Sequence, residues 1–97
     1  MDGLEKEILI RLGTEGRRMI SEIEGSFPAA RQTVHVRVQK LVRLGHVREE
    51  RTAGFPPRRY LSLTNGGKRA LELELSKERV ALEERERAVA AVLAPVA

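Results

Sequence analysis

The chain of 97 residues has no cysteine, two histidines and only three aromatic residues. Without cysteine it can form neither disulfide bridges nor thiolate metal sites. His35 and His46 are not accompanied by a cluster of further metal ligands, so we expect no metal and no cofactor. No apolar run approaches the roughly 20 residues that a membrane-spanning helix requires, so we expect no membrane partner.

The N-terminal stretch MDGLEKEILI is acidic and amphipathic, unlike the basic start and apolar middle of a signal peptide. We therefore expect a cytoplasmic protein. A chain of 97 residues makes one small domain with a limited core, which favours oligomerisation. Arginine and glutamate are abundant while glutamine and asparagine are scarce, a composition typical of a thermophilic source.

The net charge of +4 is distributed unevenly along the chain. Residues 1–27 carry a net charge of −2, residues 28–64 a net charge of +6, and residues 65–97 a net charge of zero. The middle segment holds eight basic residues against Glu49 and Glu50. Concentrated positive charge is what a phosphate-binding surface requires, although a solvated basic patch has the same composition.

Apolar spacing predicts two helices before this basic segment. The first covers Leu4–Leu12 and ends at Gly13 or Gly16, because glycine commonly terminates helices. The second begins at Ser21, where Glu24 three residues later completes a capping box.

A third helix is predicted over Pro28–Gly45, and it is the centre of the interpretation. Its apolar positions recur at helical spacing and can pack on a core; they are Val34, Val38, Leu41 and Val42. The opposite face is polar, and Gly45 provides a left-handed cap at the end.

Two strands are predicted next, His46–Arg51 and Arg58–Leu63, joined by a loop that contains two prolines. Residues 17–20 are short enough to add one edge strand to them. Four arginines surround the loop: Arg48, Arg51, Arg58 and Arg59. They are suited to phosphates or to a minor groove, although charge can also simply protect a sheet edge.

Thr64 is the expected N-cap of a last helix that runs from Gly66 to about Leu93, before the final residues 94–97. Its 28 residues would span about 42 Å, more than the width of the preceding domain. Apolar residues follow heptad spacing on one side and predict a dimerisation seam. This seam comprises Leu71, Leu75, Leu82, Val89, Val92 and Leu93. Glu78 and Arg85 interrupt it, so they either pair across a dimer or belong to a solvated strut.

The order of these elements resembles winged helix-turn-helix transcriptional regulators of the MarR, PadR and ArsR-like type, found mostly in bacteria and archaea. Three motifs carry the resemblance: Ile20–Ile23, Arg31–Val47, and Tyr60–Leu71 with its L-T-x-x-G-x-x-x-L pattern. Together with the first helix they cover residues 4–71. The metal sites of ArsR-type sensors are not carried over, because the chain lacks their Cys or His clusters. A single C-terminal helix is most similar to small PadR-like or archaeal members.

The resemblance implies a mainly α fold with a small β-hairpin, an α+β winged-helix DNA-binding domain at 1–64, and a dimerisation helix at 65–97. It also implies a homodimeric, sequence-specific regulator of transcription that binds double-stranded DNA and acts as a repressor. The recognition helix 28–45 would enter the major groove, and the wing 46–63 would contact the backbone or the minor groove.

On the recognition helix, side-chain chemistry suggests the DNA contacts. Gln32 suits adenine, Arg31 suits guanine or phosphate, and Val36 could contact a base methyl group. The full set of candidates is Arg31, Gln32, Thr33, His35, Val36, Gln39 and Arg43. Arg17 and Arg18 could add backbone contacts.

Two alternatives remain open: a non-specific architectural DNA binder, and a winged-helix module that binds another protein. No catalytic motif accompanies His35, so we expect no enzyme. The last helix has no aromatic residue that could enclose an effector ligand. Whether an effector exists is therefore left open.

Overall fold

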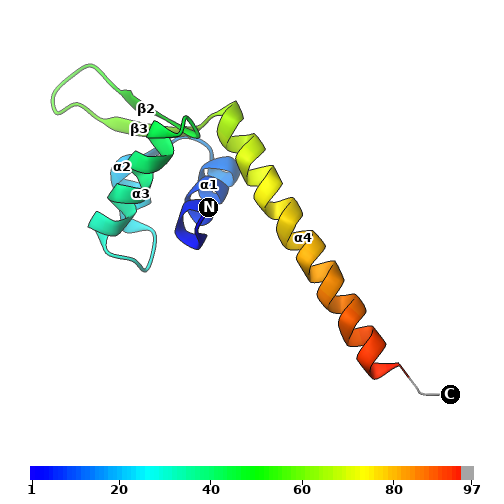
Figure 1. The fold of residues 1–97 in the computed structure, drawn as a ribbon. Helices are drawn as coiled ribbons and strands as arrows, with labels where there is room; N and C mark the ends of the chain where they lie inside the picture. Colours follow the sequence, from blue (N-terminus) through cyan, green and yellow to red (C-terminus); the bar gives the residue numbers. More distant parts are fainter. Residues whose placement is uncertain (95–97) are drawn as a thin grey trace.

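The computed structural model describes residues 1–94, which fold into four helices and a three-stranded sheet (Figure 1). In chain order the elements are α1 (Gly3–Glu15), β1 (Arg18–Met19), α2 (Ile20–Gly25), α3 (Arg31–Arg43), β2 (Val47–Arg51), β3 (Arg59–Leu63) and α4 (Asn65–Leu93). This architecture confirms the predicted fold class, a mainly helical chain with a small hairpin. The predicted segment 65–97 includes residues 95–97, which lie outside the described residues.

Helix α1 begins with a capping box that the sequence analysis missed. The Glu5 amide donates to Asp2 Oδ1 at 2.8 Å, and the Asp2 amide donates to Glu5 Oε2 at 3.2 Å. The helix continues through Gly13 and ends at Gly16, whose φ of 79° favours glycine. Of the two predicted stops, Gly16 is therefore the one used.

The predicted start of α2 was wrong. The helix begins at Ile20 after an uncapped N-cap residue, Met19, so Ser21 lies inside the helix and forms no capping box. The reason is the preceding strand: Met19 pairs with Tyr60 of β3, which keeps the backbone extended up to that residue. The carboxylate of Glu24 is free for a different contact.

The predicted start of α3 at Pro28 was also wrong, because the helix begins at Arg31. Residues 26–29 instead form a bend between α2 and α3, and Phe27 and Ala29 of this bend pack against the core. The predicted end was right. Gly45 has a φ of 76°, its amide donates to the Val42 carbonyl, and the His46 amide donates to the Leu41 carbonyl, as in a Schellman motif.

The sheet has the order β1-β3-β2, and every pairing is antiparallel. In the β2–β3 hairpin Val47 lies opposite Leu63 and Arg51 lies opposite Arg59. The hairpin and its loop form the wing, residues 46–63, which extends away from the helices in Figure 1.

One core holds the winged domain together. It is built from buried apolar residues of α1, α2, α3 and the sheet: Ile8, Leu9, Leu12, Ile23, Val34, Val38, Leu41, Val47 and Leu61. Residues three and four apart on α1 and α3 supply most of it, as the helical periodicity predicted. Leu71 of α4 packs against the edge of this core.

Helix α4 begins after the predicted N-cap Thr64, whose Oγ1 accepts from the Gly67 amide at 2.9 Å. It projects from the domain, and the molecule measures 74 × 27 × 21 Å (Figure 1). Lys6 of α1 donates to Glu78, and this hydrogen bond raises the pKa of Lys6. All residues from 75 to 94 are exposed. No helix among the described residues is long and apolar enough to cross a membrane.

Candidate nucleic-acid interface

The side of α3 that faces away from the core is centred on Gln32, Val36 and Arg43. At 3.6 residues per turn these three lie within about 40° of one another, opposite the buried valines. All three are exposed, and Val36 is 48% exposed although it is apolar. A helix face with this mixture can contact both polar base edges and the thymine methyl group.

Two further candidates flank this stripe. Thr33 is exposed, whereas Gln39 is half-buried. The Gln39 Nε2 atom is shielded from water and has no hydrogen-bond partner among residues 1–94.

Arg31 and His35 lie towards α2 rather than at the centre of the outer face. His35 Nδ1 is 2.7 Å from Glu24 Oε1, which ties α3 to α2. The Arg31 guanidinium lies over Gly25, since Nη2 would be 2.8 Å from a Cβ built there. Both side chains therefore border the helix-turn-helix junction.

The remaining cations of α3 face α1. Arg37 Nε is 2.8 Å from Asp2 Oδ2, and Lys40 Nζ is 2.7 Å from Oε1 of the buried Glu5. These ion pairs join residues 35 positions apart in the chain. They neutralise two charges of the basic segment and link α3 to the start of α1.

The arginines of the wing fall into two classes. Arg48 pairs with Glu50 at 3.3 Å, and Arg59 pairs with Glu49 across the hairpin. Arg51 and Arg58 are exposed and form no ion pair with any carboxylate of the part of the chain described by the structure. The two unpaired arginines flank the loop at the free end of the wing.

Phe55 at the tip of this loop was not among the predicted site residues. Its side chain is 99% exposed, next to Gly54 with a φ of 118°. The sequence signal was the place of Phe55 in a loop between Gly54 and two prolines, with an arginine on either side of the loop.

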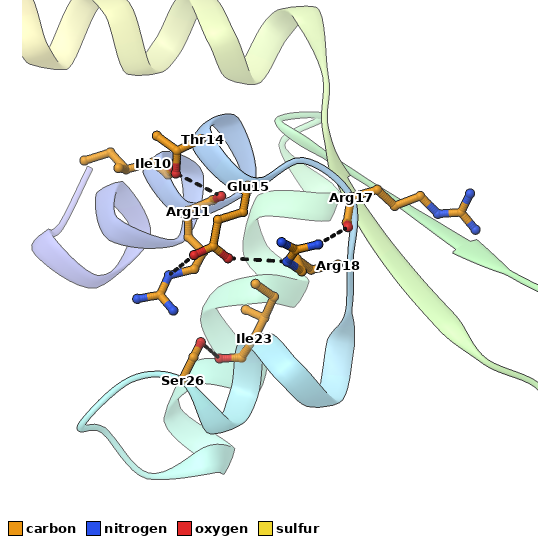
Figure 2. A network of polar contacts seen from close by, with 8 residues as sticks. All are labelled: Ile10, Arg11, Thr14, Glu15, Arg17, Arg18, Ile23 and Ser26. Carbon is orange, nitrogen blue, oxygen red and sulfur yellow. Dashed lines mark hydrogen bonds and ion pairs between the residues drawn. The ribbon is translucent and has the colours of Figure 1, made fainter.

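Figure 2 shows the polar contacts at the junction of α1, β1 and α2. Glu15 lies between two arginines, 3.9 Å from Arg11 Nε and 3.4 Å from Arg18 Nε. Arg17 points away from this network, and its guanidinium stacks on the Tyr60 ring at 4.1 Å. Arg17 and Arg18, which were proposed to make extra contacts with the DNA backbone, thus both have partners within the chain.

The six predicted dimerisation residues differ in their surroundings. Leu71 packs against the core of its own domain, and Leu75 lies at the domain edge, 42% exposed. Leu82 and Val89 are each 56% exposed, and Val92 and Leu93 are more exposed still.

Among residues 1–94, no group of three His, Cys, Asp or Glu is arranged to hold a metal ion.

These elements define a winged helix-turn-helix domain with a long C-terminal helix. A transcriptional regulator homologue from Pyrococcus horikoshii OT3 is similar in structure, with a TM-score of 0.77 and 18% identity over 86% of this chain and 83% of that one. Bacillus subtilis PadR in complex with operator DNA has a TM-score of 0.65 and 20% identity over 76% of this chain and 48% of PadR.

A transcriptional regulator of the MarR family from Enterococcus faecalis V583 has a TM-score of 0.67 and 22% identity, covering 88% of this chain and 76% of that one. A regulator of the ArsR family shares the fold as well. The predicted resemblance to PadR, MarR and ArsR-type regulators is thus confirmed at the level of the fold. No protein-family model matches the sequence, and no curated protein matches it.

Proposed function

We propose that the protein is a homodimeric regulator of transcription that binds double-stranded DNA with sequence preference. In this proposal α3 enters the major groove and presents Gln32, Val36 and Arg43 to base edges, with Thr33 beside them. Arg31 and His35 lie beside α2, near the DNA backbone. The dimer represses transcription by occupying its site.

The distribution of unpaired charge supports this proposal most strongly. Arg43, Arg51 and Arg58 are exposed without a carboxylate partner in the described chain, and they belong to α3 and the wing. In contrast, Arg37 and Lys40 are neutralised by α1. Positive charge left unpaired on a groove-sized helix and an adjacent hairpin suits a phosphate backbone.

The wing is proposed to follow the backbone into the minor groove. Arginine is favoured in narrow minor grooves, and apolar side chains of minor-groove binders often insert between base steps. Arg51 and Arg58 would provide the arginines for the minor groove, and the exposed Phe55 at the tip would provide the apolar side chain for insertion.

The test compares two variants that each remove two positive charges. Arg51→Ala with Arg58→Ala removes the unpaired charges of the wing, whereas Lys77→Ala with Arg87→Ala removes exposed charges of the projecting helix. Fluorescence anisotropy with labelled duplex DNA over a salt series should show affinity at least tenfold weaker for the wing variant and little change for the control. Equal weakening in both variants, or no binding of the parent chain at low salt, would refute the proposal.

The same measurement separates the alternatives. A non-specific architectural binder would bind unrelated duplexes equally, with a steep salt dependence. A protein-interaction module would bind no duplex, and its partner would bind independently of Arg51 and Arg58.

A further inference from the structure

The projecting helix carries an apolar stripe that is symmetric about its own centre. The stripe consists of Leu71, Leu75, Leu82, Val89 and Leu93, which lie within about 40° of one another around α4. Leu75 and Val89 are each seven residues from Leu82, and Leu71 and Leu93 are each eleven residues from it. A stripe with this spacing superposes on itself when the helix is reversed end for end.

We propose that a second copy of the chain covers this stripe, and that the two α4 helices run antiparallel about a two-fold axis close to Leu82. The inference rests on the homodimer of the proposed function and adds its orientation and register. In this antiparallel pair, the apolar end of each α4 packs on the winged domain of the other copy.

A groove on the winged domain provides the place for that end. The groove has a volume of about 350 Å³ and lies between α1, β3 and α4, where Ile10, Leu63, Leu71 and Leu75 line it. The last turns of α4 present an apolar surface formed by Ala88, Val89, Val92 and Leu93. In the antiparallel pair this surface lies level with Leu71 and Leu75 of the other copy, so each groove receives the apolar end of the partner helix.

The two charged residues within the seam distinguish the antiparallel pair from a parallel one. In a parallel pair, equivalent seam residues face each other, so Glu78 would face Glu78 and Arg85 would face Arg85. In the antiparallel pair, Glu78, which also accepts from Lys6 of its own chain, lies beside Arg85 of the second copy. On the other side of the seam, Arg79 lies beside Glu86 of the second copy. Opposite charges then flank the apolar stripe on both sides, which favours this orientation.

The orientation determines how far apart the two winged domains are. Arg69 lies near the start of α4, 13 residues before Leu82. At 1.5 Å per residue, the two copies of Arg69 are about 39 Å apart along an antiparallel pair. In a parallel pair they would lie level with each other, separated by the interhelical distance of about 8–10 Å plus the reach of two outward-pointing side chains.

Spin labelling measures this distance directly, and the absence of native cysteine makes the labelling specific. Arg69 is exposed and outside the stripe, so Arg69→Cys should leave the pairing intact. Double electron–electron resonance on the labelled full chain should give a distance of about 40 Å. A distance below about 30 Å would overturn the antiparallel register while leaving the homodimer in place. A monomer in solution would overturn both.

Cysteine cross-linking gives a second test of the register. Leu75→Cys and Val89→Cys are prepared separately and mixed, and sedimentation first establishes that each variant remains dimeric. Under mild oxidation we expect disulfides between position 75 of one copy and position 89 of the other, and far less cross-linking within either variant alone. Efficient cross-linking of Leu75→Cys with itself would contradict the antiparallel pair.

Discussion

At the scale of single residues, carboxylates determine which cations of the segment 28–64 remain available to a ligand. Arg37, Lys40, Arg48 and Arg59 each have a carboxylate partner. The other four basic residues of the segment have none in the described chain: Arg31, Arg43, Arg51 and Arg58. The net charge of the segment thus overstates the charge of the surface that we propose for DNA, and it does not reveal where that surface lies.

The neighbouring arginines Arg58 and Arg59 should therefore behave differently when each is replaced by alanine. Arg58→Ala should weaken binding to all duplexes alike and reduce the salt slope by about 0.9 for each phosphate that is no longer neutralised, hence by about 1.8 in a homodimer. Arg59→Ala should change the slope less, because Glu49 already neutralises Arg59. Anisotropy titrations from low to high salt measure both slopes. The reverse order of the two variants would contradict this account of the wing.

Gln32 should affect sequence preference rather than overall affinity. A glutamine that forms two hydrogen bonds with adenine contributes about 1–3 kcal/mol of discrimination against the wrong base. Gln32→Ala should therefore bind a selected site more weakly and random duplexes almost as well as the parent chain. Competition between the two DNAs measures the ratio. An unchanged ratio would exclude Gln32 from base recognition.

At the scale of elements, the start of α4 is packed closely on the end of α3. Thr64 Oγ1 donates to the Gly45 carbonyl at 2.6 Å while accepting from the Gly67 amide. A Cβ atom at Gly67 would lie 2.7 Å from Leu63 Cδ1 and even closer to the carbonyl oxygen of His46. Gly67 is the glycine of the L-T-x-x-G motif, and the backbone packed against it leaves no room for a larger residue.

Gly67→Ala should consequently destabilise the domain by about 2 kcal/mol or more, since the added methyl group meets backbone atoms. Its neighbour provides a matched control. A Cβ at Gly66 would make only ordinary contacts, at 3.4 Å and beyond, so Gly66→Ala should stay within about 1 kcal/mol of the parent. Urea unfolding followed by circular dichroism measures both. Equal stability of the two variants would refute the close approach.

The helices and strands could be predicted from the sequence because their signals are local. Periodicity predicted α1 and identified the buried residues Val34, Val38 and Leu41 of α3. Thr64 and Gly45 marked helix ends that the structure confirms. The helix starts at Ser21 and Pro28 were predicted wrongly. In both cases tertiary contacts determine where the helix begins. These are the pairing of Met19 with Tyr60 for α2 and the packing of Phe27 and Ala29 for α3.

The candidate site was less predictable, because its electrostatics depend on distant partners. Nothing near Arg37 or Lys40 in the chain indicates that Asp2 and Glu5 neutralise them. Similarly, Glu24 looked like a capping residue but contacts His35. The roles of the individual candidates in DNA binding remain predictions.

At the scale of the whole molecule, α4 carries apolar residues far beyond its own domain. Leu82→Glu places a charge at the centre of the proposed helix pair and should convert the dimer to a monomer. Val80→Glu is the control, since Val80 is 50% exposed on the other side of α4. Light scattering gives the mass of each variant. A dimeric Leu82→Glu variant would place the dimer interface elsewhere.

In vitro selection of duplexes from a random pool tests whether the chain reads double-stranded DNA through α3. We expect enrichment of a two-fold symmetric sequence, as for a dimer with one recognition helix per half-site. Gln32→Ala should select an altered or weaker sequence. A pool that remains random after repeated selection by the parent chain would show that the chain does not read DNA sequence.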